Sequence, residues 1–116
     1  MPAKDVVRRY FDALAQKGGW QAFLADSFAF RSFVSPPKQV AGKAAYLEAT
    51  QRFFSMITAV EVRELIVDGT KVCALTRYQL RSPGGMFQSD VAEIFTVRDD
   101  EIDSLSIYFD SSPFPK

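Results

Sequence analysis

The sequence contains no histidine and only one cysteine among its 116 residues. Without histidine, Ser-His-Asp and Cys-His catalysis and most transition-metal sites are excluded. Any acid–base chemistry must then fall to carboxylates, tyrosine, lysine or arginine. The single Cys73 lies inside an apolar run, which favours a small buried hydrophobic residue over a nucleophile and leaves no intrachain disulfide. We therefore expect a reducing compartment, no metal and no cofactor.

The chain also lacks an excess of charge and a long apolar stretch. Its 14 basic residues balance 14 acidic ones, so no global field favours nucleic acid. No apolar run approaches the roughly 20 residues of a membrane span. The N-terminus has the polar pattern of a helix start and not that of a signal sequence. We expect a cytoplasmic protein that binds neither nucleic acid nor membranes.

Apolar residues are plentiful, at 47% of the chain, and 14% of the residues are aromatic. Eleven of the aromatic residues are Phe, which predicts more than one aromatic cluster. Aromatic area beyond the needs of the core can line a ligand cavity or a dimer interface. The length suits one domain, and we expect residues 1–116 to form it.

Three helices are predicted in the first half of the chain. Residues 3–16 place their apolar side chains on one helical stripe, and Gly18-Gly19 ends it. Residues 20–26, which begin with Trp20, predict a short second helix. Residues 42–57 predict a third helix, whose apolar side includes Phe53 and Phe54.

Five strands are predicted. A short one over residues 27–34 ends at Ser35-Pro36-Pro37, which forces an extended loop. Four longer ones, over residues 58–67, 72–81, 86–97 and 102–109, are separated by tight turns and indicate an antiparallel meander. Helices segregated from an antiparallel sheet make an α+β fold. One sheet face must pack on the helices, and the other is solvated or covered by a partner.

Glu93 and Asp110 are the carboxylates that stand out in the last two strands. A carboxylate on an apolar strand face is costly unless it is paired, hydrogen-bonded or functional. A two-residue turn at Asp99-Asp100 would place Glu93 opposite Ser106, with Tyr108 and Asp110 on the same face. The two carboxylates would then lie ~13 Å apart, too far for a close pair. The structural alternatives are a Glu93 held by neighbouring hydroxyls and an Asp110 that caps a turn.

The face on which Arg77 lies depends on the register of the preceding hairpin. A direct pairing across the turn at residues 82–85 sets Arg77 opposite Asp90 as an ion pair, away from Glu93. Tyr78 then shares the face of Glu93. One bulge between residues 82 and 89 would reverse this, so both arrangements remain open.

The order of elements, together with the segment Val-Ala-Glu-Ile-Phe-Thr-Val-Arg-Asp-Asp-Glu-Ile-Asp-Ser-Leu-Ser-Ile-Tyr-Phe-Asp at residues 91–110, resembles the SnoaL-like family of the nuclear transport factor 2-like superfamily. The resemblance covers residues 5–110. It implies three N-terminal helices packed on a strongly curved, mainly antiparallel sheet, which form a cone with an internal pocket. It also implies a homodimer through the open sheet face.

The resemblance also implies roles for particular residues. Glu93 corresponds to the protonated acid with which ketosteroid isomerases bind an oxyanion, and Ser32 stands where those enzymes have a general-base Asp. Asp110 corresponds to the acid–base Asp of the polyketide cyclases. Epoxide hydrolases have an Arg-x-Asp pattern that appears here as Arg77-Tyr78-Gln79, so their second carboxylate is replaced.

We therefore expect a pocket for a small apolar ligand with one or two oxygens. In an isomerase- or cyclase-like enzyme, Asp110 would move the proton and Glu93 would donate a hydrogen bond to an enolate oxygen. The expected ligand-binding residues are Tyr78, Tyr108, Ser32, Trp20, Phe53 and Arg77. The alternative is a non-enzymatic homodimeric binding or accessory domain with a vestigial pocket, and epoxide hydrolysis is the third possibility.

Overall fold

A computed structural model describes residues 1–33, 38–110 and 112–113. Its helical elements are α1 (Ala3–Ala15), the 3₁₀ helix η1 (Trp20–Phe23) and α2 (Lys43–Met56). Its strands are β1 (Leu24–Ser32), β2 (Lys38–Ala41), β3 (Ile57–Asp68), β4 (Lys71–Ser82), β5 (Gly85–Arg98) and β6 (Glu101–Phe109). The predicted loop at Ser35-Pro36-Pro37 lies outside the described residues.

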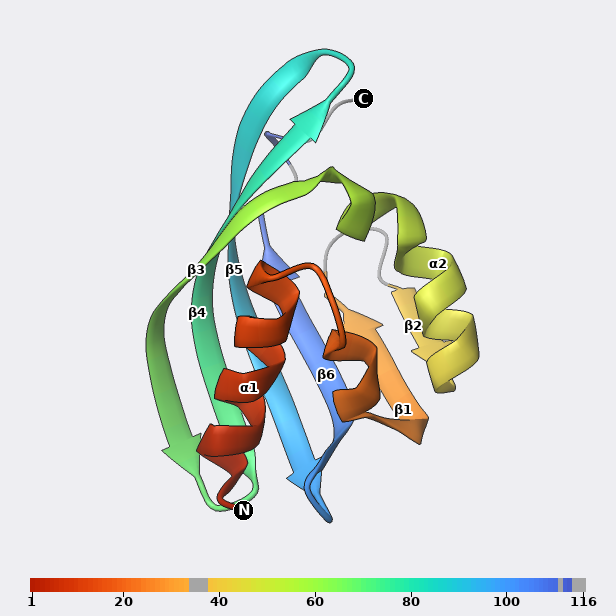
Figure 1. Ribbon diagram of the computed structural model, residues 1–116, viewed down its shortest axis with the longest axis vertical. Coiled ribbons are helices and arrows are strands. Elements are labelled where there is room, and N and C mark those ends of the chain that lie inside the picture. The colour runs from red at the N-terminus through yellow and green to blue at the C-terminus, as the bar shows by residue number, and fades with distance from the viewer. Residues whose placement is uncertain (34–37, 111, 114–116) are drawn as a thin grey trace.

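The strands form one six-stranded sheet in the order β2-β1-β6-β5-β4-β3. Strands β3 to β6 are an antiparallel meander, and β1 pairs with β6 in parallel. Both α-helices lie over the same side of the curved sheet (Figure 1). The α+β prediction is confirmed, and so is the mainly antiparallel sheet.

The prediction of three helices is wrong, because residues 20–23 form only one turn of 3₁₀ helix. Gly19 has a φ of 81°, which turns the chain sharply after α1, and Leu24 is already extended, with a φ of −91° and a ψ of 133°. Four residues between these two points are too few for an α-helix. The strand β1 therefore begins three residues earlier than the predicted Ser27.

Helix α1 packs on the part of the sheet formed by β3, β4, β5 and β6. Its buried side chains are Val6, Val7, Tyr10, Phe11 and Leu14, which follow the helical spacing seen in the sequence. Tyr10 and Phe11 each meet the fully buried Phe95 of β5 edge to face, with ring centroids 5.6 Å apart. This aromatic cluster is the centre of the core.

Helix α2 packs less closely on the sheet. Tyr46 is its only fully buried residue, and the Phe53 and Phe54 side chains are only partly buried. The helix contacts β1, β2 and β4, while α1 contacts β3, β4, β5 and β6. The space between α2 and the sheet is therefore where a cavity can form. Within the described residues, no helix is long and apolar enough to cross a membrane.

The hairpin between β4 and β5 decides whether Arg77 or Tyr78 shares the face of Glu93, which the sequence left open. Arg77 pairs with Asp90 and Tyr78 pairs with Ser89, with no register shift along these strands. Alternate residues of β4 are buried from Val72 to Leu80, and Tyr78 is among them. Arg77 therefore lies on the outer face and Tyr78 on the inner, helix-covered face.

The hairpin between β5 and β6 confirms the predicted turn but not the predicted register. Asp99 and Asp100 have φ of 53° and 63°, and Val97 pairs with Ile102 as expected. A bulge at Asp103 then shifts the pairing, so that Glu93 lies opposite Ile107 and not Ser106. Tyr108 consequently pairs with Ala92 on the outer face. The expected shared face of Glu93, Tyr108 and Asp110 is wrong.

Candidate functional site

A cavity of ≈ 240 Å³ lies between α2 and the inner face of the sheet. Aromatic side chains are the largest group in its wall: Tyr10, Phe30, Tyr46, Phe53, Phe54, Tyr78 and Phe109. The aliphatic part of the wall comprises Val40, Ala49, Val91, Leu105 and Ile107. The polar lining residues are Ser32, Lys38, Thr50, Ser89 and Glu93. An apolar cavity with a few polar groups is the usual form of a small-molecule site.

Glu93 is the central polar group of this cavity. Strand β5 carries it on the inner face, and it is only 4% exposed. The Tyr78 hydroxyl donates a hydrogen bond to Oε2 of Glu93 at 2.9 Å, and the Thr76 hydroxyl lies 2.8 Å from the same oxygen. Oε1 receives no hydrogen bond from any described residue. The carboxyl group is therefore held at one oxygen and available at the other.

Burial changes the acidity of this group. It raises the pKa of Glu93 from the ordinary 4.5 to about 7, although the hydrogen bonds from Thr76 and Tyr78 act in the opposite direction. Near neutral pH the carboxyl is thus present in both its neutral and ionised forms. Burial and the nearby negative charge of Glu93 also raise the pKa of Tyr10 and of Tyr46, so both phenols remain neutral donors.

Four of the expected site residues line the cavity: Glu93, Tyr78, Ser32 and Phe53. Ser32 is buried near the end of β1, where it lies beside Ile107 of β6. Trp20 does not line the cavity, but it is buried behind the wall and packs on Phe54 with ring centroids 4.2 Å apart. Within the described residues, no three His, Cys, Asp or Glu side chains are placed to hold a metal.

Asp110 does not lie in the cavity. It follows the last residue of β6, is exposed, and accepts hydrogen bonds at 2.9 Å from both the backbone N–H and the hydroxyl of Ser112. These bonds lower the pKa of the Asp110 carboxyl. Asp110 therefore caps a turn, as the structural alternative proposed. The bulge at Asp103 explains why Asp110 does not share the face of Glu93.

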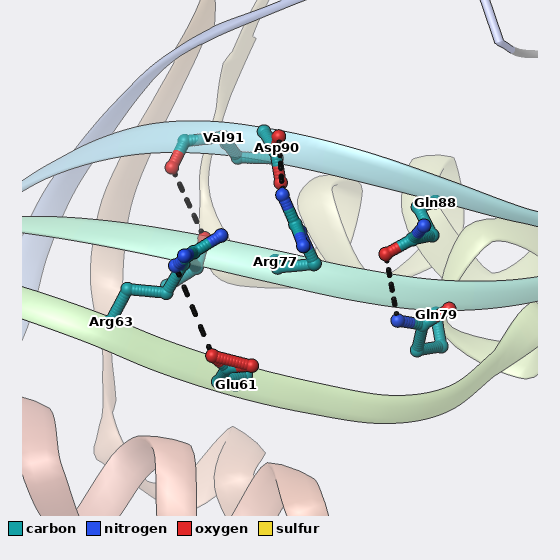
Figure 2. A network of polar contacts seen from close by, with 8 residues as sticks. Glu61, Arg63, Arg77, Gln79, Gln88, Asp90 and Val91 are labelled. Atoms are coloured by element: carbon teal, nitrogen blue, oxygen red, sulfur yellow. Dashed lines mark hydrogen bonds and ion pairs between the residues drawn. The ribbon is translucent and has the colours of Figure 1, made fainter.

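Tyr108 and Arg77 also point away from the cavity. Tyr108 is 48% exposed and stacks on Phe33, with ring centroids 4.6 Å apart and planes 6° from parallel. Arg77 forms an ion pair with Asp90, 2.8 Å from Nε to Oδ1, on the outer face of the sheet (Figure 2). Epoxide hydrolysis would need Arg77 inside the cavity, so this third possibility has no support from the geometry.

Sequence reasoning did not single out Thr76, Ser89, Tyr10 or Lys38 as site residues. The alternation that places Tyr78 and Glu93 on one face also includes Thr76 and Ser89, so this pattern could have identified both. Tyr10 lies on the buried stripe of α1 and looks like any other core residue. Lys38 belongs to β2, a strand that the sequence analysis did not predict.

The comparisons with known proteins support the same fold. The sequence matches the SnoaL-like domain over residues 7–105, and no curated protein matches it. Among solved structures, a protein from Jannaschia sp. described as a SnoaL-like polyketide cyclase superposes with a TM-score of 0.80 at 17% identity, covering 98% of this chain and 93% of that one.

Two further structures of low sequence identity share the fold. An NTF2-like protein from Cytophaga hutchinsonii has a TM-score of 0.75 at 20% identity, covering 97% of this chain and 94% of that one. A Catenulispora acidiphila protein with a ketosteroid isomerase-like fold, in complex with trimethylamine, has a TM-score of 0.75 at 18% identity, covering 93% and 87%. With 99 consecutive positions matched, the chain belongs to the SnoaL-like domain family.

Proposed function

We propose that the chain binds a small, mostly apolar molecule in the inner cavity and that Glu93 contacts an oxygen of that molecule. The observation that supports this most directly is the asymmetry of the carboxyl group. Oε2 has two hydroxyl neighbours, whereas Oε1 has no partner among the described residues. When the carboxyl is neutral, its proton is placed more favourably on Oε1, because Oε2 already accepts hydrogen bonds. It can then donate to a carbonyl or hydroxyl oxygen.

The size and lining of the cavity limit the ligand. An apolar cavity of about 150 Å³ accommodates benzene, so ≈ 240 Å³ suits a molecule of roughly one or two rings. Apart from Glu93, the only charged residue among the described lining residues is Lys38, which is largely exposed. A neutral apolar ligand with few oxygens therefore fits the cavity best.

Binding can be tested with para-phenylphenol, which combines an apolar body with one hydroxyl. Because Trp20 packs on the lining residue Phe54, its fluorescence can report occupancy. Glu93→Leu should weaken binding about tenfold, because the phenol oxygen loses its partner. Asp110→Asn is the matched control, since it alters an exposed carboxylate outside the cavity. Equal affinity in Glu93→Leu and wild type, or no binding to the wild type, would contradict the proposal.

A second candidate function is proton transfer of the isomerase or cyclase type. It is supported by a carboxyl of pKa about 7 beside the neutral phenols of Tyr10 and Tyr46. Ionised Glu93 would take a proton from the carbon next to a carbonyl, and a tyrosine hydroxyl would donate to the enolate oxygen. Glu93 would then return the proton to the same carbon or to a conjugated one, which leaves the charge balanced.

Carbon–hydrogen exchange separates the enzyme from a binding domain. In deuterated water, an enzyme of this type should exchange the protons next to the carbonyl of α-tetralone, as seen by NMR. Glu93→Gln should abolish the exchange, because an amide cannot accept the proton, while the cavity keeps its shape. Absence of exchange in wild-type protein that binds the ketone would favour the non-enzymatic alternative.

We also propose a homodimer through the outer face of the sheet. Ile66 of β3 is 53% exposed there, and Leu75, Ile94 and Tyr108 add further apolar area that the helices do not cover. Such an apolar sheet face suits a second copy of the same face. Light scattering should give the mass of a dimer, and Ile66→Lys should give a monomer. A monomeric wild type at tens of micromolar would contradict this.

A further inference from the structure

The hydroxyl group of Ser89 has no hydrogen-bond partner among the described residues. The residue lies on β5, is 1% exposed and lines the cavity. Within the part of the chain that the structure describes, Ser89 Oγ is the only buried side-chain nitrogen or oxygen that makes no hydrogen bond. Buried polar groups are nearly always paired, because an unpaired one loses its hydration without compensation.

The position of Ser89 relative to Glu93 indicates what could form a hydrogen bond with the Ser89 hydroxyl. Ser89 precedes Glu93 by four residues on the same face of β5, with Val91 between them. Thr76, which hydrogen-bonds to the Glu93 carboxyl, pairs with Val91, so the carboxyl leans toward Ser89. The two polar groups are thus separated by between two and four residue rises, roughly 7–13 Å.

We propose that Ser89 is a specificity-determining residue that binds a second polar atom of the ligand. This inference rests on the proposed function, because it assumes that the ligand occupies the cavity and contacts Glu93. The ligand is then an elongated apolar molecule with one oxygen at Glu93, a hydrocarbon body over Val91, and a second oxygen at Ser89. The hydroxyl hydrogen of Ser89 can rotate about the Cβ–Oγ bond to suit that oxygen.

The surroundings of Ser89 also indicate the charge of that second group. Its described neighbours on the inner face are Phe87, Val91 and Tyr78, and none of them carries a charge. Lys38 belongs to β2, which is three strands away from β5 in the sheet. A carboxylate or ammonium group placed at Ser89 would have no counter-ion among the described residues. A neutral hydroxyl or ketone suits a serine hydroxyl, which can both donate and accept.

A matched pair of probes tests the inference. The molecule para,para′-biphenol is para-phenylphenol with one hydroxyl added at the far end. Wild-type protein should bind the biphenol about tenfold more tightly, which corresponds to one additional hydrogen bond. In Ser89→Ala this tenfold advantage of the biphenol should disappear, so that the variant binds the two probes equally. Ser106→Ala, a serine of β6 on the outer face, should keep the tenfold difference.

The results distinguish this inference from the proposed function. If para-phenylphenol binds and depends on Glu93, but the biphenol binds no better or its advantage survives Ser89→Ala, the Ser89 inference alone is overturned. If neither probe binds to the wild type, both are overturned. A crystal structure of wild-type protein with the biphenol gives an independent measurement: its second oxygen should lie within hydrogen-bond distance of Ser89 Oγ, and a different position would refute the inference.

Discussion

The Tyr78 hydroxyl donates a hydrogen bond to Oε2 of Glu93 at 2.9 Å, from the strand next to the one that carries the carboxyl. This bond stabilises the ionised form of Glu93, while the apolar surroundings stabilise the neutral form. The resulting pKa of about 7 is the balance of burial, which raises it, against the hydrogen bonds from Thr76 and Tyr78, which lower it. The acidity of the cavity therefore depends on single hydroxyl groups.

Removal of one hydroxyl should shift this balance. Tyr78→Phe keeps the ring and deletes the donor, so we expect the pKa of Glu93 to rise by about one unit, since a hydrogen bond to a charged group contributes about 1.5 kcal/mol or more. Carbon NMR of labelled glutamate side chains can follow the titration. Tyr46→Phe is the control, because that hydroxyl lines the cavity without a hydrogen bond to Glu93. A pKa unchanged by Tyr78→Phe would show that the bond is absent in solution.

Glu93 should also make the stability of the protein depend on pH. Its pKa is about 7 in the folded state, against the ordinary 4.5 expected for the unfolded chain. Between these values the folded state binds more protons than the unfolded state, so the free energy of unfolding falls as pH rises through this window. The loss amounts to roughly 3 kcal/mol and is complete above the folded-state pKa.

Denaturation by urea at several pH values can measure this effect. Glu93→Gln has no carboxyl to ionise, so its free energy of unfolding should match the wild type near pH 4 and exceed it by about 3 kcal/mol near pH 9. Asp90→Asn changes a carboxylate on the exposed outer face. Its free energy of unfolding should therefore depend on pH as that of the wild type does between about pH 4 and pH 9. A Glu93→Gln variant that parallels the wild type across this range would contradict the raised pKa.

The fold was predictable to the extent that each element carries its own local signal. The burial of alternate residues in β4 follows directly from the alternation in the sequence, and this alternation placed Tyr78 correctly once the hairpin register was known. The turn at Asp99-Asp100 was equally evident. Glu93 was found because a carboxylate within an apolar strand is conspicuous.

The bulge at Asp103 could not be predicted, because both faces of β6 carry apolar or hydroxyl-bearing residues. Ile107 and Phe109 suit an inner face, and Ser106 and Tyr108 are also acceptable there, so the pattern does not choose a register. A pocket was expected, but its place beneath α2 was not, because the sequence of this helix does not show that Phe53 and Phe54 remain only partly buried.

The turn between β5 and β6 offers a gain in stability. Asp100 adopts a φ of 63°, a left-handed conformation that is unfavourable for a residue with a Cβ atom. Asp100→Gly should therefore raise the free energy of unfolding by about 1 kcal/mol. The ion pair at 3.0 Å between Asp100 and the N-terminus would be lost, but both groups are partly exposed, so this reduces the gain only slightly.

A glycine placed one residue later should have the opposite effect. Glu101 is the first residue of β6 and is extended. Glu101→Gly therefore raises the conformational entropy of the unfolded chain without relieving strain in the folded state, and it should lower the thermal midpoint. If Asp100→Gly also lowered the midpoint, the left-handed turn would not be the conformation in solution.

The bulge itself can be tested by deleting single residues. Without Asp103, Ile102 would still pair with Val97 and Ser104 with Thr96, so the inner face would keep Leu105 and Ile107. This deletion should leave a cooperatively folded protein with a thermal transition near that of the wild type, because only the hydrogen bond of 3.4 Å from Ser27 to Asp103 and the local bend are lost.

Deletion of Ser106 is the matched comparison, since it removes one residue of the same strand beyond the bulge. It would move Ile107 and Phe109 from the inner to the outer face and bring Tyr108 inward, because side chains alternate along a strand. We expect a loss of about 3 kcal/mol or more from two partly buried apolar side chains leaving the inner face of the sheet, seen as a much lower thermal midpoint in circular dichroism. Equal effects of the two deletions would mean that Glu93 does not lie opposite Ile107.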